Sequence, residues 1–253
     1  MTYCVALRLD AGIVMLSDTR TNAGIDNVSR YGKMFTWEVP GERAICLMCA
    51  GNLSITQGVV TAIDTALRRR GAAADDRDPD AGTETILSAD SMYRVAEIVG
   101  AHMATMQERY RDQLSAQGQA ADASIIVAGQ RIGGEHRAFM VYSPGNFIEA
   151  TPDTPFLQIG EHKYGKPILD RVITPETPIA RALKAVYVSM DSTLRSNLSV
   201  GMPLDLAVIR CGDCRFALRR RIEEGDAEFT DISERWSNAL RDAFGSIPDI
   251  AGV

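Results

Sequence analysis

A chain of 253 residues can bury one full hydrophobic core, and its 45% hydrophobic and 24% charged residues are ordinary for a globular protein. The net charge of −6 argues against a polyanionic partner, so we expect neither nucleic acid nor a membrane surface to bind. The longest uncharged apolar stretches, 44–51 and 124–129, are too short to span a bilayer. Arg8 and Asp10 interrupt the apolar run at the N-terminus, so we expect no signal peptide and a cytoplasmic protein.

The first third of the chain predicts two β-hairpins. Apolar residues at 4–9 and 13–17 indicate two strands joined by a turn at residues 10–12. A polar segment, 18–32, is expected to be mostly loop. The second hairpin pairs 33–39 with 43–49 and turns at Pro40-Gly41.

The apolar spacing then changes to that of helices. Asn52 or Ser54 can cap a helix that runs to about residue 70, and residues 71–90 are expected to form a surface connection. A longer helix is predicted over 91–117, with a stripe of apolar residues that includes methionines. Such a stripe usually packs in a core.

Strands return in the second half, at 124–128, 137–142 and 146–150. Thr177 is a good N-cap, with Pro178 at the first helical position. A last hairpin, 205–210 with 215–222, precedes an amphipathic helix over 232–244. Hairpin-linked strands that alternate with groups of helices predict a layered α+β domain with antiparallel sheets, and no linker divides the chain.

Two C-x-x-C pairs could suggest zinc, but the expected geometry argues against a metal site. Cys46 and Cys49 lie in a predicted strand, where residues three apart point to opposite faces. Cys211 and Cys214 flank Gly212-Asp213, which is predicted to be a two-residue hairpin turn. We therefore expect reduced thiols and no bound metal.

Several enzyme classes are excluded by their motifs. The chain has neither a G-x-S-x-G nucleophile elbow nor a G-x-G-x-x-G loop after a strand. The segment 160–166 resembles a phosphate loop, but Pro167 stands where the magnesium-binding hydroxyl residue should be. The three histidines are scattered without ligand spacing. No cofactor is expected.

The N-terminus offers a different chemistry. Thr2 is small enough for routine removal of Met1, which would leave a threonine with a free α-amine. Its hydroxyl is then a nucleophile, and its own amine, with an ordinary pKa of about 8, is a base held in the same residue. Many proteins begin Met-Thr, so this feature alone decides nothing.

The residues that follow make the pattern specific. The second predicted strand ends in Ser-Asp-Thr-Arg at 17–20, Lys33 opens the third, and the fourth ends at Gly51 before a helix. This order and spacing resembles proteasome-type β subunits. The string Ser-Asp-Thr-Arg-Thr-Asn-Ala-Gly at 17–24 is most similar to the bacterial ancestral β-subunit family called Anbu. The resemblance is strong from Thr2 to Gly51 and loose after about residue 216.

The resemblance implies a four-layer αββα sandwich of two antiparallel sheets. It implies one proteasome β-type domain over 1–253, with a C-terminal extension from about residue 216. The implied activity is hydrolysis of peptide bonds by an N-terminal threonine through an acyl-enzyme. The implied partners are a peptide substrate and further copies of the chain in a ring-like or open helical homo-oligomer. Because the chain has no convincing nucleotide motif, any unfoldase would be a separate protein.

The resemblance also assigns roles to single residues. Thr2 would be the nucleophile, Lys33 would lower the pKa of its hydroxyl and amine, and Asp18 would hold Lys33. The Gly51 N–H, at the first turn of a helix, would donate to the oxyanion. The remaining implied residues bind an extended peptide through their backbone (Thr21, Asn22) or support the site (Arg20, Ser199).

The chain departs from the family pattern in two places. Proteasome subunits have Gly-Ser-Gly near the third helix, whereas this chain has Gly-Glu-His at 160–162. Their later Asp-x-x-Ser-Gly is replaced by Ser196-Asn-Leu-Ser199-Val, without the Asp. The groups that tune the terminal amine, and the strength of any peptidase activity, are therefore left open.

Two alternatives to a peptidase remain. One is an N-terminal-nucleophile amidase that acts on a small amide, and the other is a weakly active or non-catalytic subunit whose role is assembly. Without Thr2, Asp18 and Lys33 would be interpreted as an ordinary surface ion pair. For assembly, the helix over 91–117 is the predicted interface, because Met103 and Leu114 widen its apolar stripe.

Overall fold

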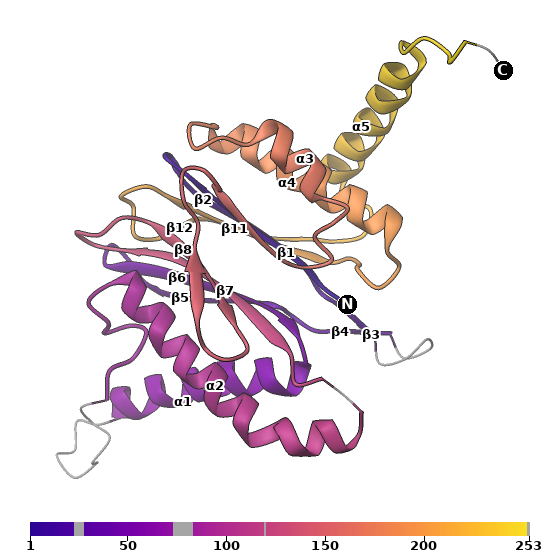
Figure 1. Cartoon of the computed structure of the whole chain (residues 1–253). Helices are drawn as coiled ribbons and strands as arrows, with labels where there is room; N and C mark the ends of the chain where they lie inside the picture. The colour runs from indigo at the N-terminus through magenta and orange to yellow at the C-terminus, as the bar shows by residue number, and fades with distance from the viewer. Residues whose placement is uncertain (23–27, 73–82, 119, 252–253) are drawn as a thin grey trace.

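Two antiparallel sheets of five strands each lie face to face, with helices against both outer surfaces (Figure 1). The structure is a computed structural model and describes residues 1–22, 28–72, 83–118 and 120–251. The predicted four-layer αββα sandwich is confirmed. Within the described residues, no helix is long and apolar enough to cross a membrane.

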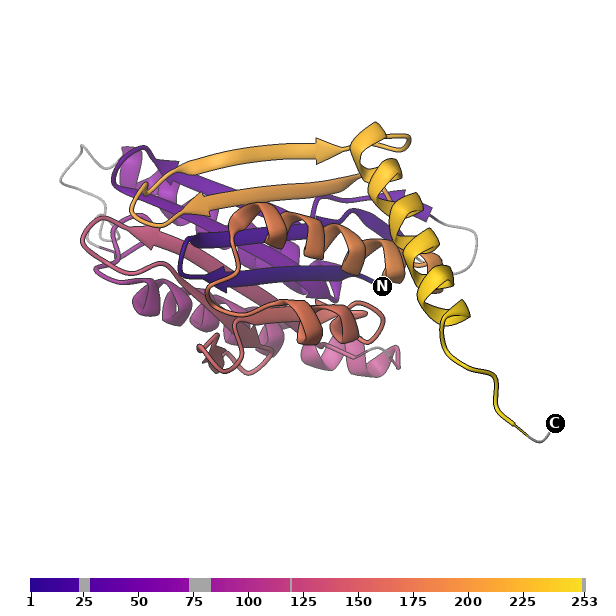
Figure 2. The same cartoon turned by 90° about the horizontal axis from the view of Figure 1, so that it is seen from above.

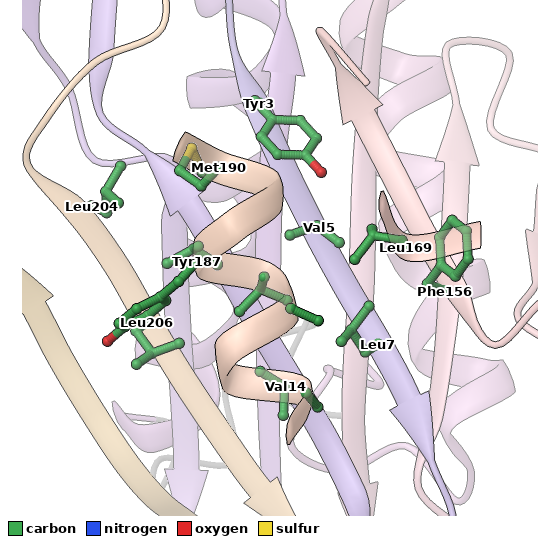
Figure 3. Close-up of a cluster of buried hydrophobic side chains, with 14 of the residues drawn as sticks. Tyr3, Val5, Leu7, Val14, Phe156, Leu169, Tyr187, Met190, Leu204 and Leu206 are labelled. Atoms are coloured by element: carbon green, nitrogen blue, oxygen red, sulfur yellow. The ribbon is translucent and has the colours of Figure 1, made fainter. Parts of the chain in front are cut away.

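The first sheet has the strand order β10-β1-β2-β11-β12. Its side chains alternate as a strand requires: Tyr3, Val5 and Leu7 point to the helices, whereas Cys4 and Ala6 point to the other sheet. Figure 3 shows the first group packed against α4. The strands are β1 (Tyr3–Leu9), β2 (Gly12–Asp18), β10 (Phe156–Gly160), β11 (Leu204–Arg210) and β12 (Phe216–Ile222).

The helices on the first sheet are α3 (Lys166–Val172) and α4 (Ile179–Ser196), and α5 (Ala227–Gly245) follows β12. Figures 1 and 2 show that only the start of α5 lies over α4, while the rest of α5 projects away from the body. The predicted terminal helix is therefore confirmed and is longer at its N-terminal end. Neither β10 nor α3 is among the sequence-based expectations.

The second sheet has the order β5-β6-β7-β8-β9 and is covered by two long helices. Residues such as Leu47 and Phe139 pack beneath the helices in a second apolar core. The elements are β5 (Met34–Val39), β6 (Arg43–Gly51), β7 (Ala123–Arg131), β8 (Arg137–Tyr142), β9 (Phe147–Glu149), α1 (Leu53–Ala72) and α2 (Met92–Ala116). Part of the predicted connection between α1 and α2, residues 73–82, lies outside the described residues.

Alanines such as Ala6, Ala128 and Ala207 pack between the two sheets together with isoleucine, methionine and leucine side chains, and these three alanines are fully buried. Cys46 belongs to this middle core, whereas Cys49 belongs to the core under the helices. The prediction that these two cysteines point to opposite faces of one strand is confirmed.

Four sequence-based expectations about the secondary structure and the interface helix need correction. Thr177 does not cap α4, because its hydroxyl accepts the Thr174 N–H at 2.9 Å and the helix begins after Pro178. The last hairpin has no two-residue turn, because β11 ends at Arg210 and β12 begins at Phe216. The polar segment after β2 contains a short two-stranded sheet, β3 (Arg20–Asn22) with β4 (Val28–Arg30), around residues 23–27, which lie outside the described part.

The fourth correction concerns the predicted interface on α2. Ser91 caps this helix, since its side chain accepts the Arg94 N–H at 3.1 Å. Met103, however, is fully buried in the core beneath the helix. It cannot contact another copy of the chain. Leu114 packs at the edge of the same core.

Candidate active site

The end of β10 holds the backbone of Thr2, which immediately precedes β1. The Thr2 carbonyl oxygen accepts the Glu161 N–H at 2.7 Å, and Tyr3 pairs with Gly160 across the two strands. Gly160 has φ +81°, and a Cβ atom there would lie 1.9 Å from the Thr2 oxygen. Only glycine allows this close approach. Thr2 is 8% exposed and is therefore buried at this strand end.

A buried ion pair lies beside Thr2. The Lys33 ammonium donates to Asp18 Oδ1 at 2.7 Å, and the two side chains are 6% and 0% exposed. The same ammonium donates to the carbonyl oxygens of Arg20, at 2.6 Å, and Met1, at 3.2 Å. Lys33 immediately precedes β5, as predicted to within one residue. Its charge is therefore directed at the peptide group that joins Met1 to Thr2.

Asp18 is held by the backbone at both carboxylate oxygens. Oδ1 accepts the Tyr3 N–H at 3.0 Å, and Oδ2 accepts the N–H groups of Arg20 and Gly201, each at 3.2 Å. Burial raises the pKa of the Asp18 carboxyl, and Lys33 and the backbone N–H groups oppose that rise. The carboxylate thus joins the ends of three chain segments and fixes Lys33 among them.

The same buried charges change the pKa of the terminal amine. Burial lowers the pKa of the amine at Met1, and the positive charge of Lys33 lowers it further, while Asp18 and Glu161 act in the opposite direction. If Met1 is removed, the amine of Thr2 takes its place next to these groups. A lowered pKa increases the fraction of such an amine that is unprotonated and able to act as a base at a given pH.

Arg20 fastens a loop from the C-terminal part of the chain to this site. Its guanidinium donates to the Leu198 carbonyl oxygen at 2.9 Å, and a Cβ atom at Gly201 would lie 2.2 Å from its Nε. Ser199 belongs to the same loop, where its N–H donates to the Asn197 side chain at 2.9 Å. Within the described residues no hydrogen bond joins Ser199 to Thr2, so its predicted supporting role stays a prediction.

Gly51 ends β6 and does not lie in the first turn of a helix, which corrects the expectation for it. It has φ +99°, and a Cβ atom there would lie 2.4 Å from the Asp122 carbonyl oxygen. Helix α1 begins two residues later, at Leu53, and Asn52 caps it by accepting the Ser54 N–H at 3.0 Å. The backbone at this position is thus set by a glycine conformation rather than by a helix terminus.

A pocket of about 560 Å³ opens in front of Thr2. Lys33 and Gly51 lie on its wall, as does Thr21 in β3. Asn22 follows Thr21 in the same strand, and its side chain lies outside the described part. Further lining residues come from β5, β6, α1, α2 and the junction between β6 and α1: Phe35, Cys49, Ala50, Asn52, Leu53, Ser54, Thr56, Gln57 and Leu114. The fold therefore brings four of the predicted residues, Thr2, Lys33, Gly51 and Thr21, to one cavity.

Sequence reasoning did not assign three residues that build this site. Gly160 and Glu161 hold the Thr2 backbone, and Gly201 donates to Asp18. A glycine directly after a short apolar run, as at Gly160, is a signal for a strand that ends against another backbone. Gly201 has no comparable local signal, because its contact with Asp18 spans 183 residues.

Gly160→Ala is expected to lower the free energy of unfolding by several kcal/mol, because the new methyl group would overlap the Thr2 carbonyl. Gly225→Ala is the matched control, since Gly225 also has φ +81° but has no atom within 4 Å of the new Cβ. The control should lose only the strain of a left-handed residue, about 1–2 kcal/mol. Denaturant unfolding measures both. Equal losses would show that the Thr2 backbone moves freely away from β10.

Comparison with known proteins gives full-length structural matches. A structure of Anbu from Hyphomicrobium sp. strain MC1 is 43% identical, with a TM-score of 0.87 over 99% of this chain and 100% of that one. A helical assembly of the Anbu complex from Pseudomonas aeruginosa is 40% identical, with a TM-score of 0.87 over 99% and 98%. Anbu from Yersinia bercovieri is 38% identical, with a TM-score of 0.87 over 99% and 100%. No family model and no curated protein matches.

The paired antiparallel sheets, with a threonine at the entrance of β1, define the N-terminal-nucleophile hydrolase fold in its proteasome β-type form. Within this class, sequence identity of about 40% to the Anbu structures over the whole length identifies the family. The chain belongs to the Anbu, or ancestral β-subunit, family of proteasome-like proteins.

Proposed function

We propose that the protein is an N-terminal threonine peptidase that works through an acyl-enzyme. The observation that carries the proposal is the buried Lys33–Asp18 pair, whose ammonium reaches the peptide group before Thr2. Burying two charges is costly, and replacing such a pair with apolar residues is often neutral or stabilising. A pair buried against a threonine at the wall of a pocket is therefore better explained by catalysis than by stability.

In the proposed reaction, Met1 is first removed. The free amine of Thr2 takes the proton of the Thr2 hydroxyl, and Oγ1 attacks the carbonyl carbon of the peptide. Lys33 favours the deprotonated nucleophile through its charge. The oxyanion of the tetrahedral intermediate accepts the Gly51 N–H. When the C–N bond breaks, the leaving amine takes the proton from the Thr2 amine, and the acyl group remains as an ester on Oγ1.

Water completes the cycle. The Thr2 amine takes a proton from the water molecule, the hydroxide adds to the ester carbonyl, and the C–O bond to Oγ1 breaks. The acid product leaves, and the proton returns to Oγ1. A peptide substrate would extend along β3, where Thr21 and Asn22 offer backbone groups. Its side chain would enter the pocket against Phe35, Leu53 and Leu114.

Intact mass spectrometry before and after a peptide epoxyketone tests this proposal. The epoxyketone reacts with a hydroxyl and a neighbouring free amine together, so one adduct reports both Met1 removal and the nucleophile. We expect a single adduct on Thr2. A protein that lacks Met1, is folded and stays unlabelled by both an epoxyketone and a β-lactone would contradict the proposal and favour the non-catalytic alternative.

A second experiment tests which class of substrate the protein hydrolyses. Turnover of an unfolded protein and of small amides, measured side by side, separates a peptidase from a small-molecule amidase. The pocket wall that includes Phe35 and Leu53 suits an apolar side chain. We expect cleavage of extended peptides, and activity confined to small amides would replace the peptidase by the amidase.

We also propose that the chain assembles with itself, because the Pseudomonas aeruginosa relative is a helical assembly of the Anbu complex. Sedimentation velocity at micromolar concentration is expected to show species several times the 27.5 kDa chain mass. A single species at the mass of one chain would refute self-assembly. That result would not bear on the proposed chemistry of Thr2, which the epoxyketone adduct tests separately.

A further inference from the structure

Glu161 continues the pairing of β10 with β1 to the level of Thr2. Tyr3 pairs with Gly160, so the same register sets Thr2 opposite Glu161, and the Glu161 N–H donates to the Thr2 carbonyl oxygen at 2.7 Å. Residues that lie directly opposite each other in an antiparallel pair have Cβ atoms about 4.5–5.5 Å apart. Glu161 is therefore the cross-strand neighbour of the residue that carries the proposed nucleophile.

The carboxylate of Glu161 is sheltered from water but only loosely paired. Its side chain is 12% exposed, and among the described residues its one ion pair is with Lys163, at 3.5 Å. Lys163 is 65% exposed, and a pair with such an exposed partner contributes little free energy. Burial removes part of the hydration of the carboxylate, and this pair does not replace it. The ion pair with Lys163 therefore does not explain why a glutamate lies here.

The terminal amine offers this carboxylate a second cation. Burial and Lys33 lower the pKa of the amine at Met1, whereas Asp18 and Glu161 raise it. Asp18 is already held by Lys33 and by three backbone N–H groups. The Glu161 carboxylate has no hydrogen bond within the part of the chain that the structure describes, so its charge is available to the amine.

The other titratable side chains around the amine are held by backbone oxygens. Arg20 donates to a carbonyl oxygen of the loop after α4, and His162 Nδ1 lies 3.1 Å from the Gly160 carbonyl oxygen. Neither side chain is among the groups that shift the pKa of the amine. Glu161 is thus the group that can balance the charge of Lys33 at the amine without giving up another hydrogen bond.

The reaction proposed above needs this balance. When the Thr2 amine takes the proton of its hydroxyl, it becomes an ammonium close to Lys33, and like charges disfavour that form. A carboxylate near the amine favours the ammonium and makes the amine a stronger base. We propose that Glu161 is a positioning residue of this site, whose carboxylate attracts the Thr2 ammonium that forms during the attack. This inference rests on the peptidase chemistry proposed above, and it gives a role to one of the two places where the chain departs from the family pattern.

The pH dependence of hydrolysis by Glu161→Gln tests this role. The substitution keeps the side-chain size and the backbone N–H that binds Thr2, and it removes only the charge. Because the carboxylate raises the pKa of the amine, its loss should move the acid limb of the activity profile to lower pH, by about half a unit. The rate above that limb should fall about tenfold, since the amine becomes a weaker base.

Competitive acylation by acetic anhydride reports the pKa of the amine without relying on hydrolysis. Only the unprotonated amine reacts, so the pH dependence of acylation, followed on the N-terminal peptide by mass spectrometry, titrates this amine. We expect a lower pKa in Glu161→Gln than in the wild type. Glu161→Asp keeps the charge and should lie closer to the wild type in both measurements.

Glu135→Gln is the matched control, because it removes the same charge near the opposite end of β1, where Glu135 lies 3.7 Å from Arg8. It should change neither the acid limb nor the acylation profile. Each variant is first shown to keep the wild-type unfolding midpoint.

An amine pKa in Glu161→Gln equal to that of the wild type, or an equal shift in Glu135→Gln, would overturn the role of Glu161 and leave the peptidase proposal standing. A wild-type protein with neither turnover nor an epoxyketone adduct would overturn the peptidase proposal, and with it the part that Glu161 plays in the attack. The acylation profile separates these two failures, because it is measured whether or not the protein hydrolyses peptides.

Discussion

Thr2→Ala is expected to abolish hydrolysis while the protein stays folded, because the substitution removes the only proposed nucleophile. Loss of a covalent nucleophile costs on the order of 10⁶-fold in rate in a comparable hydrolase. The fold should tolerate the change, since the contacts that hold this residue involve its backbone carbonyl and the Glu161 N–H. Initial rates on a peptide substrate, with unfolding measured on the same sample, check this.

Thr2→Ser is the conservative counterpart. It keeps the hydroxyl and loses the methyl group that restricts χ1, so the nucleophile is less well oriented. We expect a rate lower by about tenfold and an epoxyketone adduct still on residue 2. Full activity in the Ala variant would rule out the mechanism, and an inactive Ser variant would show that the methyl group itself is needed.

Lys33→Ala should reduce turnover by about 10²- to 10⁴-fold, because it removes the charge that favours both the deprotonated hydroxyl and the free amine. The ammonium contacts three oxygens, those of Asp18, Arg20 and Met1, and a guanidinium is too large and planar to replace it. Lys33→Arg should therefore not restore the rate.

The pH profile gives a second readout for Lys33. Its positive charge lowers the pKa of the terminal amine, so its loss should raise that pKa and move the acid limb of the activity profile to higher pH. A residue that served only to pair with Asp18 would leave this limb unchanged. Lys166→Ala, which breaks an exposed pair with Asp170, is the control and should alter neither rate nor profile.

Lys33→Ala leaves Asp18 buried without its partner, which can cost about 3–5 kcal/mol of stability. The double variant Lys33→Met with Asp18→Asn keeps the side-chain volume and buries no charge. It should fold and remain inactive. Wild-type turnover in either the single or the double variant would show that the Lys33–Asp18 pair has only a structural role.

The sequence by itself determined the layered fold and the core of the candidate site. The apolar run at 4–9 predicts a strand, because strand-forming composition is a local property. In the structure Val5 and Leu7 of this strand face the helices, and Cys4 faces the other sheet. The helical spacing of α2 was equally local. The pairing of Lys33 with Asp18 was predicted from the resemblance to proteasome β subunits, which is strong over residues 2–51.

Only the tertiary structure decided how that site is closed and which surfaces remain free. The Gly201 N–H donates to Asp18 across 183 residues of sequence. Met103 is fully buried, although Ala101 and Thr105 on the same helix are exposed. The sequence allows the Thr177 hydroxyl to cap α4, but in the structure this hydroxyl accepts the Thr174 N–H of the preceding turn instead. Periodicity and capping describe contacts between residues a few positions apart. The packing of distant segments depends on which surfaces meet, and only the folded chain shows that.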